Sequence, residues 1–355
     1  MGNYAELTVT DGLIEMTAFG RHTALSRRGD RERVVTGPAD WLARYGPFGF
    51  TTGPDGTVGR QPWANITMSP HFPSVAQVVA ELYPQSDGRE IDGVVGLDVT
   101  ALEQLVVLVG PIDVPEASEP LDETNTSDFL LREQYFVTDI DERADLLESV
   151  ARQTLERLLS GNPPPPLELG RALAPMAAGR HLQAWSSVDA EQAVIATASM
   201  SGELPTDVAG RREVAVTLNN AAGNKIDSFI DTDVSVDHDD DGTTIVDIVL
   251  VNDAPAERFP DYVVGNAVGL ERGDTRYFLS LFTDSPSVSG LVNGGPAALS
   301  PQLETSLWAH SLYVDAPLGE TTTLRFEIDD PCVGCSVVLA EQPLGGSASW
   351  SVTIG

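Results

Sequence analysis

One segment, Glu90–Val114 (EIDGVVGLDVTALEQLVVLVGPIDV), limits what this chain can fold into more than any other. An apolar β-type run at Ile91–Val95 is followed by Asp98 and then by a stretch of helical character. Gly110-Pro111 breaks that stretch, and a second β-type run follows at Ile112–Val114. This order predicts a strand–helix–strand unit with an acid where the first strand gives way to the helix. That position is the usual place for chemistry or ligand binding in an α/β domain.

The rest of the first half alternates strands with helices. Two β-type runs, Tyr4–Thr10 and Leu13–Phe19, flank Asp11-Gly12, a dipeptide typical of a two-residue hairpin turn. The run Pro163–Pro166 marks the end of a long helical pattern. We therefore expect an α+β or α/β domain over residues 1–165, with a sheet flanked by helices. The predicted helices lie near Ala39–Tyr45, Ser74–Tyr83 and Asp141–Ser160.

Beyond about residue 210 the pattern changes to short β-type runs separated by Gly, Pro, Asn and Asp. This pattern predicts an all-β sandwich over residues 210–355. Residues 166–209 are expected to form a helical connector that packs on the first domain. A chain of 355 residues is also too long for one typical hydrophobic core, so two domains are expected. The predicted strands are Arg212–Leu218, Thr243–Val251, Tyr262–Val264, Arg276–Phe282, Thr321–Ile328 and Ser347–Ile354.

The formal net charge of −32 is extreme for a chain of this length. Such a charge keeps a protein soluble, and it repels phosphate groups before any specific contact forms. We therefore expect neither nucleic acid nor an anionic membrane surface as a partner.

The sequence contains no apolar run of the roughly 18 residues that a transmembrane helix needs. Residues 2–10 already alternate like a strand, which is not the pattern of a signal peptide. A chain that starts inside a strand is expected to be a fragment or to carry a misassigned start, with an anchor or export signal missing upstream. A membrane is accordingly expected as a partner only through that missing N-terminal anchor.

The two cysteines, Cys332 and Cys335, form a Cys-Val-Gly-Cys motif. This spacing occurs in redox-active dithiols, but no thioredoxin-like βαβ pattern surrounds it and no second cysteine pair is present for zinc. We favour a small structural disulfide that pins a loop, which is typical of an exported protein.

Candidate metal ligands include an acidic run at Asp237–Gly242 (DHDDDG), which matches the first half of a calcium loop. An EF-hand would then need a glutamate at its twelfth position, which is Ile248 here, and the flanking residues are β-type. A plain hairpin turn and a calcium site with Asp237, Asp239 and Asp241 therefore both stay open. The five histidines show no metal-ligand spacing, and surface or packing roles are expected for each.

A cluster of arginines follows the second predicted strand in a chain that is otherwise poor in positive charge. Because arginine can contact phosphate or carboxylate through two hydrogen bonds, the cluster is a candidate anion clamp. The alternative is a solvated loop that neutralises nearby acids. The cluster consists of Arg21, Arg27, Arg28, Arg31 and Arg33, and Arg132 and Arg143 are the other cations that could converge on it.

Four groups of fragments resemble a bacterial cell-envelope family catalogued as domain of unknown function 4012. They are GNYAELTVTDG at 2–12, WANITMSPHFP at 63–73, IDGVVGLD with GPIDV in the central unit, and NAAGNKIDSF at 220–229. The fragments are spread over nearly the whole chain. The resemblance implies an extracytoplasmic protein of the cell envelope that is anchored in the membrane.

The order of elements in the first half also resembles the LytR–CpsA–Psr phosphotransferases, which attach polyprenyl-diphosphate-linked glycans to the bacterial wall. Their second strand ends in an arginine, which Arg21 matches, and IDGVVGLD with GPIDV parallels their next unit. Arg132, and Asp141 with Arg143, are loose counterparts of their later motifs. The resemblance implies a LytR–CpsA–Psr-like domain over residues 1–165.

If the chain is an enzyme, the resemblance implies a phosphotransferase that acts on a lipid-linked glycan precursor. Arg21, Arg132 and Arg143 would neutralise the diphosphate, and a carboxylate such as Asp98 or Asp141 would hold magnesium. Arg27, Arg28, Asn65 and Ser69 are the expected substrate-binding residues. The alternative is a non-catalytic envelope scaffold or binding module whose β-sandwich mediates the interactions.

Overall fold

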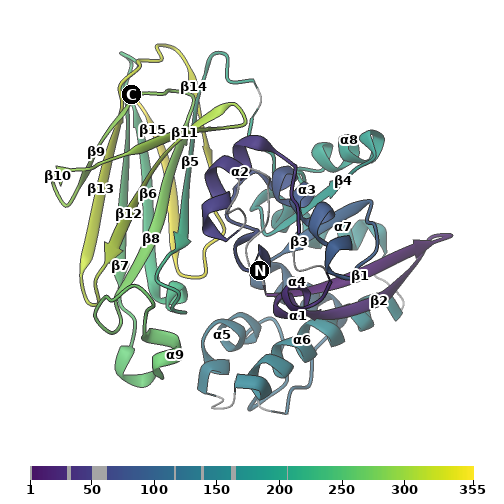
Figure 1. Ribbon diagram of the computed structural model, residues 1–355. Helices are drawn as coiled ribbons and strands as arrows, with labels where there is room; N and C mark the ends of the chain where they lie inside the picture. The colour runs from purple at the N-terminus through teal and green to yellow at the C-terminus, as the bar shows by residue number, and fades with distance from the viewer. Residues whose placement is uncertain are drawn as a thin grey trace. The chain divides into compact units, whose positions relative to one another are not determined.

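The computed structural model describes residues 2–29, 33–49, 62–115, 117–136, 140–160, 165–205 and 207–355. Of residues 62, 140–145, 160 and 166 it describes the backbone alone. The chain divides into two compact units, Met1–Glu203 and Leu204–Gly355, each with its own core (Figure 1).

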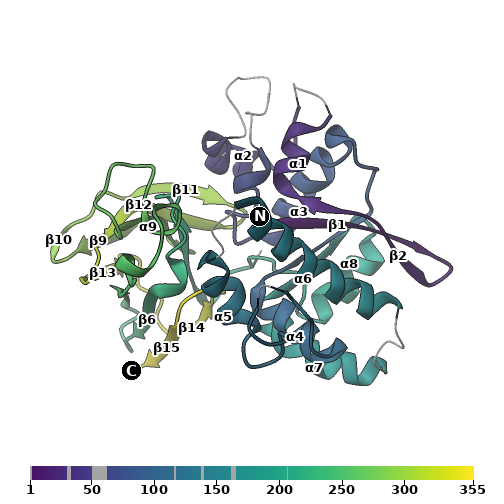
Figure 2. The same cartoon turned by 90° about the horizontal axis from the view of Figure 1, so that it is seen from below.

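The first unit begins with the predicted hairpin, in which β1 (Asn3–Thr10) pairs antiparallel with β2 (Leu13–Arg21). Asp11 and Gly12 both have positive φ angles, 51° and 81°, as a two-residue turn of this kind requires. The hairpin prediction is confirmed. Figures 1 and 2 both show the tip of the hairpin extending away from the helices of its unit, and Leu13 at the tip is 77% exposed.

A helical segment rich in aromatic residues follows the hairpin. Its buried cluster includes Trp41, Tyr45 and Trp63, with Val78 and Leu82 from one face of α3. The helices expected near 39–45 and 74–83 are thereby confirmed, the second with its start two residues earlier. The elements are α1 (His22–Arg27), α2 (Ala39–Tyr45), η1 (Gly46–Phe48), η2 (Pro62–Asn65), α3 (Phe72–Leu82) and η3 (Pro84–Ser86).

The central segment corrects the predicted strand–helix–strand unit. β3 (Gly93–Leu97) and α4 (Val99–Val109) form as expected, but Ile112 makes only an isolated bridge with Leu121. Ile112 and Val114 are buried in a cluster with residues of the helices. Their apolar character therefore reflects packing against helices and not membership of a sheet. The second strand of the unit was therefore predicted wrongly.

The partner of β3 comes from much further along the chain. β4 (Leu182–Ser186) pairs with it antiparallel, with Leu97 opposite Leu182. Phe72 and Val75 of α3 pack against this pair, together with Val94 and Trp185. β4 lies inside the segment for which only helices were expected, and it belongs to the first unit.

Helices make up most of the remainder of the first unit. The long helix expected near 141–160 is confirmed as α6, and α4, α5 and α6 enclose a core that includes Val106, Phe129 and Val150. Among the described residues no helix has both the length and the apolarity needed to cross a bilayer. The elements are α5 (Thr126–Leu131), η4 (Glu133–Phe136), α6 (Ile140–Ser160), α7 (Pro166–Ala178) and α8 (Asp189–Thr197).

The second unit is rich in β-structure, as expected, and contains two large sheets (Figure 1). One has the order β10-β9-β13-β7-β6-β15 and the other β11-β12-β8-β5-β14. Only the edge pairs β14–β5 and β15–β6 are parallel. The strands are β5 (Arg211–Asn220), β6 (Ile230–His238), β7 (Thr244–Asn252), β8 (Thr275–Thr283), β9 (Val288–Val292), β10 (Gly295–Pro296), β11 (Ser300–Glu304), β12 (Leu307–Ala316), β13 (Thr321–Ile328), β14 (Ser336–Ala340) and β15 (Ala348–Ile354).

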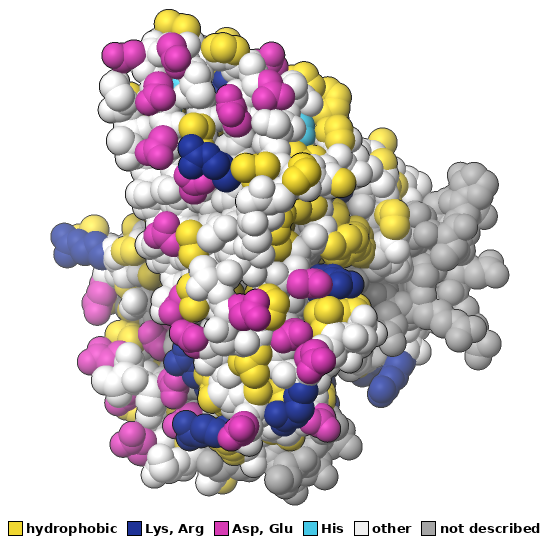
Figure 3. All heavy atoms as spheres, turned by 90° about the vertical axis from the view of Figure 1, so that its left-hand side faces the viewer, with side chains coloured by type: hydrophobic (Ala, Val, Ile, Leu, Met, Phe, Trp, Pro, Cys, Tyr) yellow, Lys and Arg dark blue, Asp and Glu magenta, His cyan; other side chains and the backbone are white. Residues whose placement is uncertain are grey.

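Alternating burial along the strands accounts for this core. In β6, apolar residues such as Val234 and Val236 are fully buried, whereas Asp231, Asp233 and Asp237 between them are exposed. This is the period of two that a sheet with one covered face produces. Figure 3 shows acidic side chains scattered over the face that carries the six-stranded sheet, with few cations among them.

Two kinds of error mark the prediction for this unit. Tyr262–Val264 is not a strand but part of the short helix α9 (Asp261–Val264), since a run of three residues is too short to show a period. β6 and the strands β9–β12 and β14 were missed. In β6 the outward-facing aspartates concealed the apolar alternation. Two short 3₁₀ turns complete the unit, η5 (Asp227–Phe229) and η6 (Ala256–Arg258).

Candidate functional site

Asp98 is the acid that the sequence placed at the end of the first central strand. It is the N-cap of α4, where its Oδ1 accepts a hydrogen bond from the Ala101 amide at 3.0 Å. Its Oδ2 lies 2.7 Å from Nδ1 of His181, and its own amide donates to the His181 carbonyl at 3.1 Å. Both carboxylate oxygens are therefore used by the protein. His181 was missed because it lies 83 residues away, at the start of the unpredicted strand β4.

The segment at 69–72 lies at the same end of the β3–β4 pair. Ser69 Oγ accepts a hydrogen bond from the His71 amide at 3.0 Å, which closes a small turn before α3. The half-buried Arg180 guanidinium donates to the carbonyls of Pro70 and Gly202. Ser69, predicted to bind substrate, therefore has a structural bond within this turn.

Asn65 and the first arginines of the predicted clamp also make local contacts. Asn65 Nδ2 donates to the Phe48 carbonyl at 2.9 Å. Arg21 is the N-cap residue of α1, and Arg27 and Arg28 are exposed at the end of that helix. Arg28 donates to the Tyr4 hydroxyl at 3.3 Å. These three arginines are therefore close in sequence around one short helix.

Arg33 and Arg132 differ from the exposed arginines. Arg33 is only 4% exposed and donates to the backbone carbonyls of Leu25 and Arg28, so it stabilises the turn after α1. Arg132 follows α5 and pairs with Asp128 one helical turn earlier, at 2.9 Å. Both arginines therefore have structural partners within the first unit.

Three predicted residues have no described side chain. Arg31 lies outside the described residues, and the side chains of Asp141 and Arg143, near the start of α6, also lie outside what the structure describes. Among the described residues no group of three or more His, Cys, Asp or Glu side chains is placed to hold a metal ion.

The acidic run at 237–242 forms the turn between β6 and β7. The Gly242 amide donates to the Asp239 carbonyl at 2.8 Å, and the Thr243 amide to Asp241 Oδ1 at 2.9 Å. Gly242 has a φ of +88°, which favours glycine. Asp237 lies on β6 and points outward from the sheet. The hairpin turn therefore accounts for Asp239, Asp241 and Gly242 in the run.

We expect this turn to leave calcium unbound, because its carboxylates do not converge. Isothermal titration of the protein with calcium should give no heat of binding at about millimolar concentration, the weak end of known calcium sites. Replacement of Asp239 and Asp241 by asparagine should leave the melting temperature in calcium unchanged. A calcium-dependent rise in melting temperature that this double variant abolishes would contradict the expectation.

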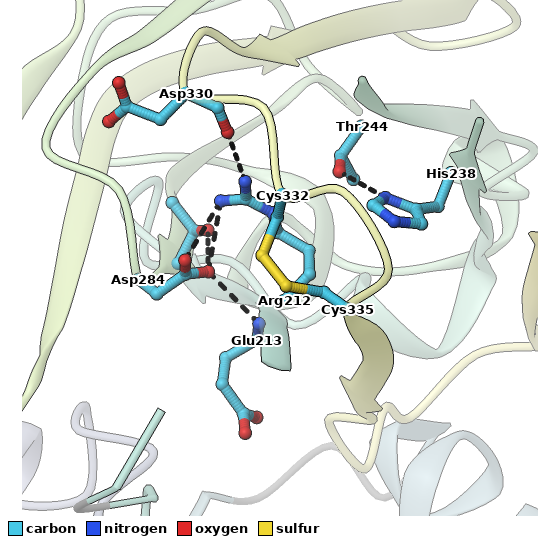
Figure 4. Close-up of a disulfide and its surroundings, with 9 residues drawn as sticks. Arg212, Glu213, His238, Thr244, Asp284, Asp330, Cys332 and Cys335 are labelled. Atoms are coloured by element: carbon cyan, nitrogen blue, oxygen red, sulfur yellow. Dashed lines mark hydrogen bonds and ion pairs between the residues drawn. A yellow bond between two sulfur atoms is a disulfide. The ribbon is translucent and has the colours of Figure 1, made fainter. Parts of the chain in front are cut away.

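The same end of the second unit carries the disulfide between Cys332 and Cys335 (Figure 4). The Cys332 amide donates to the Gly242 carbonyl at 3.0 Å, so the disulfide loop packs on the β6–β7 turn. A Cβ atom at position 242 would lie 2.6 Å from the Cys332 nitrogen. The disulfide loop and the β6–β7 turn thus pack closely against each other. Holding a loop in place is the role expected of a structural disulfide.

A cavity of about 240 Å³ lies between strand ends of the second unit. β5 contributes Asn220 and β8 contributes Tyr277, and the connection between β14 and β15 passes over it with Gln342. Both oxygens of Asp227 accept hydrogen bonds from Asn220 Nδ2, at 3.1 and 3.0 Å, and Oδ1 accepts one from the Tyr277 hydroxyl at 2.9 Å. The site is therefore a polar hollow with a carboxylate in its wall.

Burial governs the electrostatics of this hollow. Asp227 as a residue is half-buried, but its carboxyl is packed around by protein, and this desolvation raises the pKa of the carboxyl against the opposing effect of its hydrogen bonds. Burial beside Asp227 also raises the pKa of the Tyr277 hydroxyl well above its usual value. The hydroxyl therefore stays a hydrogen-bond donor at neutral pH.

Comparison with known protein families gives a match for the first part of the chain. Residues 1–135 match the family described as protein of unknown function DUF4012. No curated protein matches the chain. One solved structure, described as a "putative nutrient binding protein" from Legionella pneumophila, is similar over 33% of this chain and 42% of its own, with 6% identity and a TM-score of 0.19. A similarity at that level carries no argument about fold or function.

The DUF4012 match covers only part of the site at Asp98 and none of the cavity at Asp227. It includes Asp98 and Ser69 but ends before Arg180 and His181. It also does not reach the fragment NAAGNKIDSF at 220–229. That fragment supplies Asn220 and Asp227 to the cavity wall. The signal in the sequence that could have identified the cavity was therefore this Asn- and Asp-containing stretch at the end of a β-type run.

His71 gives the first unit a dependence on pH. Burial lowers the pKa of its imidazole below the usual value of 6.5, against the raising effect of Glu203 and Asp40. The folded state therefore keeps His71 neutral at a pH where the unfolded chain already binds a proton. The free energy of unfolding should be constant above pH 6.5 and decrease as the pH falls below that value, by at most about 1.4 kcal/mol per pH unit.

Urea unfolding of the first unit between about pH 7 and 5 measures this dependence, a range above the usual pKa values of carboxyl groups. His71→Gln, which does not titrate, should remove most of the slope. An equal slope in the wild type and the variant would show that another group is responsible.

Proposed function

We propose that this chain is a non-catalytic ligand-binding protein of the bacterial cell envelope, and that its β-rich unit carries the binding site. The cavity at Asp227 is the observation that carries the proposal. Its wall combines a carboxylate from η5, a phenol from β8, and side-chain amides from β5 and from the connection between β14 and β15, which is the composition of a small-molecule site. Hydrogen bonds hold these groups before any ligand arrives, so little ordering cost remains for binding.

The connection over the cavity supports a formed site. Gln342 accepts a hydrogen bond from the Leu218 amide at 2.7 Å and donates to the Leu218 carbonyl at 3.3 Å. On the other side the Thr232 amide donates to the Ser347 carbonyl at 2.9 Å. The connection is thus tied to both sheets, and the hollow beneath it keeps its shape.

A location outside the cytoplasm is part of the same proposal. Both cysteines of the chain are joined in the disulfide, and disulfides persist mainly in oxidising compartments. The net charge of −32 suits a soluble protein that avoids polyanions. The DUF4012 match over residues 1–135 is compatible with this location but assigns no activity.

A cavity-filling variant tests the proposal. Ligand-observed NMR with a panel of amino acids, sugars and amino sugars should detect binding to the wild-type protein. Leu344→Trp adds bulk at the half-buried wall of the cavity and should abolish the signal. Ser235→Trp, on the outer side of β6, is the matched control and should bind like the wild type. No binding by any compound, or equal binding by Leu344→Trp, would contradict the proposal.

A second function is favoured by the arginines around α1. Arg27 and Arg28 are exposed in a chain with a large negative charge, and Arg21 lies at the start of the same helix. In this second proposal the three arginines would bind an anionic group of a polyprenyl-diphosphate-linked glycan, as in a LytR–CpsA–Psr-like phosphotransferase with magnesium. A magnesium-dependent rise in melting temperature with a polyprenyl diphosphate, lost in Arg21→Ala, would establish this second function. No rise would remove it.

A further inference from the structure

The chemistry of the cavity indicates what kind of molecule it accepts. Its volume of about 240 Å³ lies below the roughly 300–1,000 Å³ of sites for drug-sized ligands, so the ligand is small. The acidic group in its wall is the carboxyl of Asp227. The other polar groups there, among them Tyr277, Thr232 and Gln342, are neutral.

The carboxylate of Asp227 is bound by neutral donors and not by a cation. Asn220 and Tyr277 supply its three hydrogen bonds. Asn220 is itself fixed, because its Oδ1 accepts the amides of Ala222 and Gly223 at 3.0 and 2.9 Å. In the part of the chain that the structure describes, no arginine, lysine or histidine forms an ion pair with Asp227.

The nearest lysine does not change this. Lys225 is exposed, and its Nζ is 3.5 Å from the Asn224 carbonyl, so it acts on Asp227 only through space. A carboxylate that is desolvated and lacks a cation is costly, and burial accordingly raises its pKa. A ligand that brings a positive charge to this oxygen pair would offset that cost.

Three other ligand classes fit less well. An anion would be repelled by Asp227. A divalent metal ion needs several oxygen ligands, and the described residues hold no group of three metal-binding side chains. A neutral sugar could make hydrogen bonds but would leave the carboxylate without a counter-charge.

We propose that the cavity binds a small organic molecule through a primary ammonium group that pairs with Asp227. The ammonium donates to the carboxylate oxygens, and the polar body of the ligand lies against Tyr277 and Gln342. The net charge of −32 raises the local concentration of such cations. This inference rests on the proposed function, since it assigns a ligand class to the same site.

Glucosamine and glucose are the probes, because they differ only in an ammonium in place of one hydroxyl. Titration of the full chain at about pH 6, where the amine is charged, should show glucosamine binding at least about tenfold tighter than glucose. Asp227→Asn should weaken glucosamine binding by about tenfold or more and leave glucose binding nearly unchanged. Asp231→Asn, which removes the same charge from the exposed side of β6, is the matched control and should have no effect.

A measurement on the wild-type protein covers the case in which Asp227→Asn fails to fold. Glucosamine should shift the NMR signals of the Asn220 side-chain amide and of Tyr277, and glucose should shift them much less. Equal binding of the two probes at the cavity would overturn the ammonium assignment and leave the binding function in place. An equal loss in Asp231→Asn would show non-specific attraction and would also overturn the ammonium assignment. Binding of neither glucosamine nor ethanolamine would overturn that assignment as well, whereas the binding function would be overturned only if no compound of the panel bound.

Discussion

Replacement of Arg212 by methionine should lower the free energy of unfolding of the β-rich unit by about 3–5 kcal/mol, the range for removing one partner of a buried ion pair. The Arg212 side chain is 1% exposed and donates to both oxygens of Asp284, at 3.1 and 3.2 Å, and to the Asp330 carbonyl (Figure 4). Methionine fills similar space but donates no hydrogen bond. The variant therefore leaves a carboxylate and a carbonyl without their donor, beside the disulfide.

The size of this loss depends on what remains for Asp284. Its carboxylate keeps the Glu213 amide and the Thr283 hydroxyl, both at 3.2 Å, so it is not left bare. Arg212→Met combined with Asp284→Asn removes the charge as well and should recover part of the stability. Chemical denaturation of the three proteins measures both effects.

Arg325 forms an exposed ion pair and serves as the control for the buried pair of Arg212. It pairs with Asp247 at 2.8 Å across β13 and β7, but its side chain is 52% exposed. Arg325→Met should therefore cost at most about 1 kcal/mol. If Arg212→Met cost no more than Arg325→Met, burial would not be what makes the first pair important.

Trp63→Ala is expected to be the most damaging change in the first unit, with a loss of about 3–5 kcal/mol. Trp63 is 1% exposed, packs edge-to-face on Tyr83 at 6.5 Å, and donates its indole N–H to Ser86 Oγ at 3.1 Å. It belongs to the 3₁₀ turn η2, whereas its two partners follow α3, so the side chain joins segments that no sheet connects. Alanine would leave a cavity in that junction.

Two further variants separate packing from hydrogen bonding at this position. Trp63→Phe keeps an aromatic ring but loses the N–H, and it should cost about 1–2 kcal/mol, because Ser86 still donates to the Leu82 carbonyl. Leu13→Ala, at the exposed hairpin tip, should change stability by no more than about 0.5 kcal/mol. Urea unfolding followed by far-ultraviolet circular dichroism measures each, and equal losses for Trp63→Ala and Trp63→Phe would assign the effect to the hydrogen bond.

Local signals in the sequence were sufficient where the interacting residues are neighbours in the chain. Asp11-Gly12 predicted the β1–β2 turn because a pair of residues with positive φ matches the twist of a tight hairpin. The spacing of apolar residues in α6 predicted a long helix in a similar way. The helical repeat is a local property, because its hydrogen bonds and side-chain neighbours lie within a few residues of one another. Cys332 and Cys335 are likewise only three residues apart, and they form the disulfide that this spacing suggested.

The candidate sites depend instead on residues far apart in sequence. Asp98 was visible as an acid between a strand and a helix, but its partner His181 directly precedes β4, which pairs with β3 across more than 80 residues. The apolar run at Ile112–Val114 looked like that missing strand, although helices cover it. Apolarity shows that a segment is buried and does not show which element buries it.

The sequence by itself therefore determined the two-part composition of the chain, the hairpin, most helices and the disulfide, because local conformation and burial pattern decide them. Tertiary structure alone decided the partner of Asp98, the burial of Arg212 and the cavity at Asp227. The cavity takes its wall from β5, η5, β6, β8 and the connection at 342–345. The pKa of the Asp227 carboxyl is raised only when the folded protein excludes water from it, and no local pattern of residues predicts that burial.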